Sequence, residues 1–336
     1  MNHSDRKRKI LHLDLDAFFC AVEEKLDPNL KGKPFAVGVS PEGRGVIASC
    51  SYAARQFGIK SAMPMRLALR KFPQLLVVHS HYRAYIESSQ QVMRILRDLT
   101  PFVEQISIDE AFLDISDLLR PAFEIAKNVQ GRIEDELSLP CSIGISTNKL
   151  VAKIATNIGK SRNSGITAPK AIVEVPSGEE EIFLAPLHVN EMWGIGPKAS
   201  AKLHQLGIRT IGNIVNTPET ILIKEFGKFG IDLVRRAHGI DDRPVSGEHQ
   251  IKSISSEVTF SHDVVDEKEL VSTIRNLSIK VGKSLRKNDL SGHTIRLKIR
   301  WPKFETHTRQ ISLREPTDQD SIITKSALQI FFEIWQ

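Results

Sequence analysis

The chain has 336 residues, a hydrophobic fraction of 41%, a net charge of +6 and an isoelectric point of about 9.1. This length predicts roughly two to three domains, and the apolar content excludes a disordered chain. The excess of cations favours an anionic partner, either nucleic acid or a membrane surface. No apolar run approaches the ~20 residues of a membrane span, so we expect no membrane protein.

The N-terminal segment and the cysteines bear on location. The first nine residues are polar and basic, and the apolar segment after them contains Asp14 and Asp16, so no signal peptide is expected. The cysteines are odd in number and far apart, which argues against a disulfide framework or a zinc site and predicts a reducing cytoplasm. They are Cys20, Cys50 and Cys141.

The first predicted strand, residues 10–16, has an acidic face. Its leucines alternate with His12, Asp14 and Asp16, so the three polar side chains share one face. Aspartate is depleted in strands, so two on one face need a reason. Alternation alone does not choose between Asp14 and Asp16.

A second acidic stretch, residues 105–116, contains the adjacent pair Asp109 and Glu110 between apolar residues. Neighbours on a strand point to opposite faces, so two adjacent carboxylates converge only where the strand turns or bends. A hairpin tip with solvated acids is the alternative, and this stretch alone leaves both interpretations open.

Three carboxylates gather if the two acidic segments adjoin. Like charges ~4 Å apart repel by ~1 kcal/mol in bulk water and by ~4 kcal/mol at an effective dielectric constant near 20. A divalent cation relieves this repulsion. Oxygen ligands with no histidine or cysteine nearby favour Mg²⁺ or Mn²⁺ over Zn²⁺.

The segments 12–19 and 107–111 together resemble motifs of the Y-family DNA polymerases, most closely the polymerase IV branch. Both motifs, in this order and about 95 residues apart, form a specific signature. The resemblance implies error-prone translesion DNA synthesis in DNA damage tolerance, on primer-template DNA and with deoxynucleoside triphosphates. It also implies a monomer in the cytoplasm, associated with the nucleoid if bacterial, and two Mg²⁺ ions for which Mn²⁺ can substitute.

The resemblance assigns roles to the acids. One ion is expected on Asp14, Asp109 and Glu110, where it would lower the pKa of the primer 3′-hydroxyl. The second is expected on Asp14, Asp109 and the Leu15 carbonyl, where it would hold the triphosphate. The family match selects Asp14 over Asp16, which is expected to be structural or to support the ligands.

The segment after the acidic strand is expected to bind the nucleotide. By resemblance Phe19 is the steric gate that excludes a ribose 2′-hydroxyl, and Phe18 lies beside it; plain core packing is the alternative for both. Tyr52 and Arg55 are three residues apart on a predicted helix, and a phenol with a guanidinium suits a phosphate. A surface arginine beside a half-buried tyrosine is the alternative. The resemblance carries both to the triphosphate.

Residues 159–165 are predicted to be a flexible basic loop. By resemblance Lys160 holds the triphosphate. The family follows this lysine with proline, one further residue and glycine, whereas Ser161 and a longer loop stand here. Arg162 is therefore a candidate to share the role.

The resemblance implies an α+β multidomain, right-hand polymerase with a palm of βαββαβ order, small fingers, a helical thumb and an α+β little finger. Small fingers imply an open site that checks base-pair shape weakly. The expected domains are a palm at 1–17 and 81–170, fingers at 18–80, a thumb at 171–240, a linker at 241–250 and a little finger at 251–336. The expected strands of the first two domains are 33–39, 46–51 and 141–145, and the helices are 52–57, 84–99, 122–137 and 149–158.

The thumb is expected to contain a helix-hairpin-helix that clamps the DNA backbone. Helices at 187–192 and 199–206 flank a turn with Gly194, Gly196 and Lys198, our candidate DNA contacts. Glycines let a phosphate approach the backbone at a helix N-terminus. An ordinary helical connection is the alternative.

The last domain is predicted to present a cationic strand face. The pattern indicates strands at 251–261, 294–301 and 306–313 and helices at 267–286 and 321–335. Three successive cations share one face of the second strand, and the third strand adds a fourth; such a stripe suits phosphates, and a solvated face is the alternative. The four candidates are Arg296, Lys298, Arg300 and Arg309.

The family's little finger has one more strand, so we expect this chain to lack it and to leave a sheet edge exposed. A longer form is expected to bind DNA more tightly and to reach the replicative sliding clamp through a C-terminal peptide. Residues 329–332 resemble such a peptide only faintly, and core helix is the preferred interpretation.

Two rival functions remain open at this stage. A nucleotide cyclase on a similar palm needs no DNA clamp, so the 187–206 turn and the basic stripe count against it. A non-catalytic DNA-binding repair scaffold explains the charge but leaves the acids on two strands without a purpose.

Overall fold

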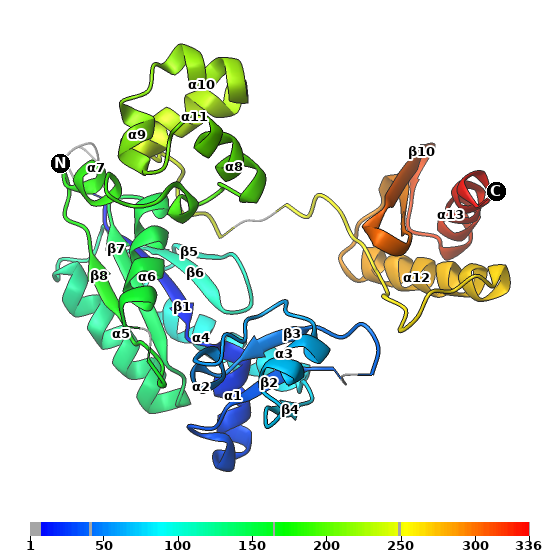
Figure 1. Ribbon diagram of the computed structural model, residues 1–336, viewed down its shortest axis with the longest axis horizontal. Coiled ribbons are helices and arrows are strands. Elements are labelled where there is room, and N and C mark those ends of the chain that lie inside the picture. The colour runs from blue at the N-terminus through cyan, green and yellow to red at the C-terminus, as the bar shows by residue number, and fades with distance from the viewer. Residues whose placement is uncertain (1–7, 40–41, 164, 248–249, 336) are drawn as a thin grey trace. The chain divides into compact units, whose positions relative to one another are not determined.

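The computed structural model describes residues 8–39, 42–163, 165–247 and 250–335 (Figure 1). The chain forms two compact units, residues 1–40 with 46–248 and residues 41–45 with 249–336. Each is a mixture of helices and strands, as the α+β prediction requires. No helix within the described ranges is long and apolar enough to cross a lipid bilayer.

The first unit is built on a five-stranded sheet of order β5-β6-β1-β7-β8. The central strand β1 pairs antiparallel with both β6 and β7, which places the two acidic segments side by side. The predicted βαββαβ order is confirmed by the sequence β1, α4, β5, β6, α5 and β7, with the small second sheet inserted after β1. The strands are β1 (Ile10–Leu15), β5 (Val103–Gln105), β6 (Glu110–Asp114), β7 (Cys141–Ser146) and β8 (Ile172–Glu174).

Three of the four helices that accompany this sheet join the leucines of β1 in the largest core, and the apolar face of the fourth, α6, belongs to a second core. Their bounds are α1 (Phe18–Leu26), α4 (Tyr82–Leu99), α5 (Ala122–Leu137) and α6 (Lys149–Arg162). Helix α6 lies very close to β7, because a Cβ at Gly144 would come within 2.0 Å of the Ala152 carbonyl oxygen.

The prediction of a flexible loop from residue 159 is wrong, because α6 extends through the first part of that segment. The helix continues to Arg162, and the amide of Asn163 still donates to the Gly159 carbonyl at 3.2 Å. Gly159 looked like a helix breaker in the sequence. It is needed for packing, because a Cβ there would come within 2.8 Å of Val173.

A small three-stranded sheet of order β3-β2-β4 has a core of its own. Helix α2 is shorter than predicted and ends at Arg55, because Gly58 follows with a φ of +70°. The sequence prediction missed α3 and β4. The elements are the 3₁₀ turn η2 (Pro28–Leu30), β2 (Phe35–Gly38), β3 (Ile47–Cys50), α2 (Tyr52–Arg55), α3 (Met65–Lys71) and β4 (Leu76–Val78).

A cluster of short helices completes the first unit around a further core. The predicted helix at 187–192 is wrong: a single 3₁₀ turn forms there, since Val189 donates to the Arg209 carbonyl and is tied to that segment. Pro197 occupies the first position of α8, where its missing amide proton costs no hydrogen bond. The elements are α7 (Glu180–Leu184), η3 (Val189–Glu191), α8 (Pro197–Gln205), α9 (Ile211–Val215), α10 (Glu219–Phe226) and α11 (Lys228–Ala237).

The segment expected to be a free linker is largely docked. Asp241 accepts from the Leu150 amide at 3.0 Å, Val245 is buried, and the Ser246 amide donates to Glu104. These contacts hold residues 241–246 on the first unit, so these six residues are not a free tether.

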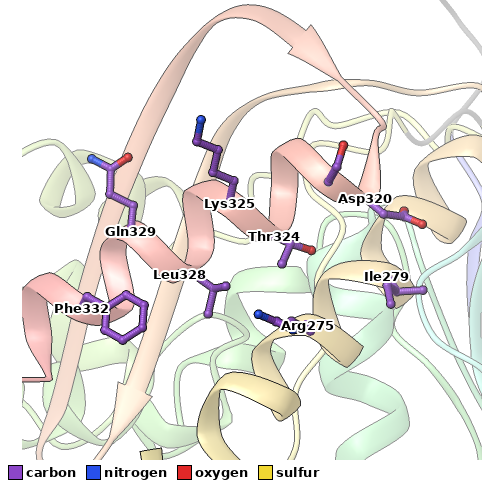
Figure 2. Close-up of a pocket in the computed structure, with 9 residues that line it drawn as sticks. Arg275, Ile279, Asp320, Thr324, Lys325, Leu328, Gln329 and Phe332 are labelled. Carbon is purple, nitrogen blue, oxygen red and sulfur yellow. The ribbon is translucent and has the colours of Figure 1, made fainter. Parts of the chain in front are cut away.

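The second unit pairs a two-stranded antiparallel sheet with two helices. Its elements are α12 (Glu267–Lys287), β9 (Gly292–Arg300), η4 (Pro302–Phe304), β10 (Thr306–Thr317) and α13 (Asp320–Ile334). The predicted strand at 251–261 is wrong, because this segment forms no strand. All of its residues are exposed or half-buried, so it has no buried face that would stabilise a strand. A pocket of about 790 Å³ is lined by α12 and α13, with Ile279, Leu328 and Phe332 among its apolar residues (Figure 2).

Candidate active site

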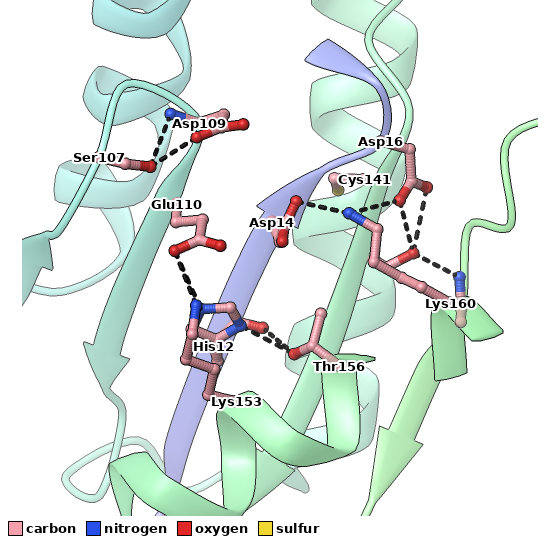
Figure 3. A network of polar contacts seen from close by, with 12 residues as sticks. His12, Asp14, Asp16, Ser107, Asp109, Glu110, Cys141, Lys153, Thr156 and Lys160 are labelled. Atoms are coloured by element: carbon pink, nitrogen blue, oxygen red, sulfur yellow. Dashed lines mark hydrogen bonds and ion pairs between the residues drawn. The ribbon is translucent and has the colours of Figure 1, made fainter. Parts of the chain in front are cut away.

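The register of the central sheet brings the predicted acids to one end of β1. Asp14 lies directly opposite Glu110, and directly opposed residues of an antiparallel pair point to the same side. Asp109 lies in the bend before β6, and its carbonyl accepts from the Leu15 amide at 3.0 Å. The convergence expected at a turn is therefore present in the backbone (Figure 3).

Each carboxylate is engaged by its own donor (Figure 3). Ser107 donates to Asp109 at 2.5 Å, Lys153 donates to Glu110 at 2.8 Å, and Lys160 forms an ion pair with Asp14. As the side chains stand, no three histidine, cysteine or acidic residues of the described chain form a metal-binding group. The ligand roles of these acids stay predictions.

Burial and neighbouring charges shift the pKa values of Asp14 and Lys160 at this end of β1. Burial raises the pKa of Asp14 even though Lys160 opposes the shift, and Glu110 raises it further. Burial alone would lower the pKa of Lys160, but Asp14 and Asp16 raise it above its ordinary value. The ammonium of Lys160 thus does not offset the effect of burial on Asp14. Such hard oxygen donors fit a divalent ion of the Mg²⁺ class.

Asp16 differs from Asp14 in its surroundings. It lies beyond the end of β1 and is 1% exposed. Ser142 donates to it at 2.9 Å, and the Lys170 amide donates at 3.0 Å. These bonds tie the end of β1 to neighbouring segments, which supports the structural role expected for Asp16.

The sequence argument that no histidine lies nearby is wrong. His12 is fully buried, and its Nε2 is 4.0 Å from Glu110. Burial lowers the pKa of His12 well below its ordinary value, and the charges of Lys153 and Lys160 lower it further. Both ring nitrogens already have partners, Thr156 and Lys153, so the predicted ligand set still contains only oxygen donors.

Lys153 is the residue that sequence reasoning missed. Together with Lys149, Thr156 and Lys160 it follows a spacing of four, three and four residues, which is the signal that could have revealed it. The spacing predicts one helical face, but the sequence does not say which strand that face meets.

The two phenylalanines after β1 have different environments. Ala17 adopts a left-handed conformation with φ 45°, which turns the chain sharply into α1. Phe18 is only 2% exposed and packs in the core, so its side chain is not available to a nucleotide. Phe19 is half-buried and stacks on Tyr85, with ring centroids 4.3 Å apart and an interplanar angle of 13°.

Tyr52 and Arg55 lie together, as the spacing on α2 predicts. The Arg55 guanidinium carbon is 4.4 Å from the centre of the Tyr52 ring. The Tyr52 hydroxyl is buried without a hydrogen-bond partner in the described part of the chain. Burial raises the pKa of Tyr52 to about 12, so this hydroxyl remains a donor at neutral pH.

The turn before α8 leads into a helix as predicted, but a 3₁₀ turn precedes it instead of the predicted first helix. Gly194 has a φ of +97°, and Arg236 donates to the neighbouring Trp193 carbonyl at 2.9 Å. Gly196 precedes the first turn of α8, and Lys198 is exposed on that turn.

The cationic stripe of the second unit loses one predicted member. The register opposes Arg296 to Gln310, Lys298 to Thr308 and Arg300 to Thr306, which places all three cations on one face. Arg309 lies opposite Leu297 and therefore points to the other face of the sheet, so its assignment to the stripe is wrong.

Comparison with known proteins identifies the family. Residues 13–157 match the impB/mucB/samB family, residues 251–336 match its C-terminal domain, and residues 177–208 match its HHH motif. The chain belongs to the impB/mucB/samB family.

Curated relatives in this family cover nearly the whole chain. The DNA polymerase IV of Dehalococcoides mccartyi is 41% identical over 326 residues, which are 96% of this chain and 82% of the relative. The DNA polymerase IV of Streptococcus sanguinis is 38% identical over 334 residues, which are 98% and 92% of the two chains. The resemblance noted from the two acidic motifs is thereby confirmed.

Solved structures confirm the fold. The Y-family DNA polymerase chimera Dbh-Dpo4-Dbh superposes with a TM-score of 0.84 at 24% identity, over 98% of this chain and 95% of the chimera. DinB from Sulfolobus solfataricus gives a TM-score of 0.66, also at 24% identity, over 97% and 93% of the two chains. The fold is thus shared with both structures at 24% sequence identity.

Proposed function

We propose that the chain extends a primer 3′-hydroxyl on damaged templates by a two-metal mechanism. It is a DNA-directed DNA polymerase of the translesion class, acts on primer-template DNA with deoxynucleoside triphosphates, and depends on a divalent metal ion. The observation that carries the mechanism is the pairing of Asp14 with Glu110 beside Asp109, at an edge where burial raises the pKa of Asp14 despite Lys160.

The acids, with the Leu15 carbonyl, are the proposed metal ligands. Two Mg²⁺ ions on Asp14, Asp109, Glu110 and Leu15, or Mn²⁺ in their place, would lower the pKa of the 3′-hydroxyl and neutralise the triphosphate. Asp16 is left to hold the end of β1 through Ser142.

The nucleotide side of the site is proposed to use three donors. Lys160 pairs with Asp14 from the last turn of α6. Its ammonium would pair with an incoming triphosphate instead. The unpaired Tyr52 hydroxyl would donate to a phosphate oxygen, with Arg55 beside it. Phe19, supported by Tyr85, would exclude a ribose 2′-hydroxyl.

The remaining assignments concern DNA and context. We propose the palm, fingers, thumb and little finger as domains, with the palm extended to β8 because that strand joins its sheet. Gly194, Gly196 and Lys198 are proposed to contact the DNA backbone, and the stripe is proposed to contact phosphates. We also propose a monomer in the cytoplasm, with the replicative sliding clamp as a further partner.

Primer extension with Mg²⁺ and the four deoxynucleotides tests this proposal. The parent protein should add nucleotides that match the template, a reaction that neither a cyclase nor a DNA-binding scaffold performs. Asp109→Asn should lower the extension rate by ~100-fold or more, because it removes a metal ligand with little change in shape. Asp135→Asn, at an exposed position of α5, is the matched control. An Asp109→Asn protein as active as the control would refute the metal assignment.

A further inference from the structure

One face of α6 carries four polar side chains, and each meets a partner on the neighbouring strands. Their spacing aligns them along the helix, and the close approach at Gly144 brings them within reach of the sheet. The pairs are Lys149 with Glu104, Lys153 with Glu110, Thr156 with His12, and Lys160 with Asp14. The proposed triphosphate contact explains Lys160, whereas nothing so far explains Lys153 beside a proposed metal ligand.

The hydrogen bonds around His12 determine its tautomer. The Thr156 hydroxyl lies 3.1 Å from the carbonyl oxygens of His12 and Ala152, and its single proton is donated to one of these. The hydroxyl therefore accepts from His12 Nδ1–H, at 2.9 Å. Nε2 is left with a lone pair.

Lys153 binds this lone pair and Glu110 together. Its Nζ is 3.4 Å from His12 Nε2 and 2.8 Å from Glu110 Oε2. The lysine side chain is only 12% exposed, and the glutamate side chain 23%. Because the ring proton is on Nδ1, Nε2 can accept from the ammonium of Lys153.

The His12 ring is itself held in place. It packs against Phe112, with ring centroids 4.7 Å apart, and Thr156 fixes its other nitrogen. A fixed acceptor below the ammonium restricts where Lys153 can lie, and Lys153 in turn restricts one oxygen of Glu110.

We propose that Lys153, seated on His12, is a positioning residue that holds one oxygen of Glu110 and leaves the other for the catalytic metal. This inference rests on the proposed two-metal function. Without the lysine, the Glu110 carboxylate would face Asp14 with no adjacent ammonium and with free rotation. Groups that orient metal ligands typically change metal affinity or activity by about 10- to 100-fold when removed.

The test combines kinetics with direct metal binding. Lys153→Met keeps the length of the side chain and removes the charge. We expect kcat to fall about 10- to 100-fold, while KM for the nucleotide changes by less than about threefold. Mn²⁺ binding to the protein on primer-template DNA, followed by electron paramagnetic resonance, should weaken about tenfold. Lys153→Arg, which keeps a cation, should recover most of the Mn²⁺ affinity.

Two further variants separate positioning from stability. Lys149→Met removes the neighbouring buried ion pair with Glu104, and it should lower the melting temperature without weakening Mn²⁺ binding. Thr156→Val is nearly isosteric and frees the His12 tautomer, so it should lower kcat by about 3- to 10-fold even if Lys153→Met does not fold.

The outcomes distinguish this inference from the function on which it rests. If Asp109→Asn abolishes extension while Lys153→Met and Thr156→Val keep the parent kcat and Mn²⁺ affinity, the positioning role is refuted and the polymerase mechanism stands. If Asp109→Asn is itself fully active, the two-metal function fails first.

Discussion

At the scale of single residues, the Tyr52 hydroxyl is the clearest open interaction of the site. A buried hydroxyl without a hydrogen-bond partner lowers the stability of the fold by about 1–3 kcal/mol. No described residue provides a partner for the Tyr52 hydroxyl. Arg55 over the same ring adds a cation at the same place. A phosphate oxygen would satisfy the phenol and the guanidinium together, which supports the proposed triphosphate contact.

Phe19 allows a test of sugar selection. Its ring is held against Tyr85, so a bulky 2′-substituent cannot push it aside without breaking the stacking of the two rings. Replacing Phe19 with Ala should raise kcat/KM for ribonucleotides by about 10- to 100-fold relative to deoxynucleotides. Single-nucleotide insertion with matched nucleotide pairs measures the ratio. Phe102→Ala, at an exposed aromatic of the same unit, is the control, and unchanged selectivity in Phe19→Ala would remove the gate role.

At the scale of elements, α6 and the docked segment 241–246 form one hydrogen-bonded assembly. Asp241 accepts from the first turn of α6 and is paired with Arg243, whose guanidinium also lies 4.7 Å from the centre of the Trp193 ring. The positions of the α6 lysines therefore depend both on their ion pairs with the strands and on the contacts that hold the start of the helix.

The pH dependence of stability should report on Asp241. Burial alone would raise the pKa of this carboxyl, but bonds from Arg243 and Leu150 hold it below its ordinary value of 3.8. A lowered folded-state pKa stabilises the protein above the unfolded pKa, and this contribution disappears as the pH falls below about 3.8. Asp241→Asn should therefore cost about 1–3 kcal/mol at pH 7 and progressively less below pH ~4.

Urea unfolding of the parent and the variant across this pH range measures the difference. Asp242→Asn is the matched control, because its side chain is 80% exposed and pairs only with Arg235 among the described residues. It should change the unfolding free energy by less than about 1 kcal/mol at any pH. A pH-independent loss in Asp241→Asn would show that packing, rather than charge, accounts for its effect.

At the scale of the whole molecule, the two units divide the proposed work. The first contains the candidate acids, the proposed steric gate and the match to the HHH motif, and the second presents three cations on one sheet face. Arg296 and Arg300 donate to Gln310 and Thr306 on the facing strand, which keeps the cations spread along that face.

Salt-dependent DNA binding tests the stripe. Replacing Arg296, Lys298 and Arg300 with Ala should make the slope of log K against log salt shallower by up to ~2.7, about 0.9 for each phosphate that is no longer neutralised. Fluorescence anisotropy over a salt series measures the slope. Arg309→Ala, on the other face, should change it by much less. Equal effects at Arg309 and Lys298 would contradict the assignment by register.

Local patterns in the sequence predicted much of this protein. Alternation in residues 10–16 and helical periodicity in 122–137 depend on neighbouring residues alone, so β1 and α5 were predicted well. The two acidic motifs were enough to suggest the family. The strand expected at 251–261 failed, because alternation is also compatible with a segment that buries no face.

Contacts between distant segments were decided only by the tertiary structure. The opposition of Asp14 and Glu110, and of Arg309 and Leu297, follows from strand register, which no local pattern specifies. The same holds for the approach of α6 at Gly144, which brings Lys153 to its acid across 43 residues of sequence. The sequence determined which side chains carry charge and on which face of their own element they lie; packing between elements decided which of them meet.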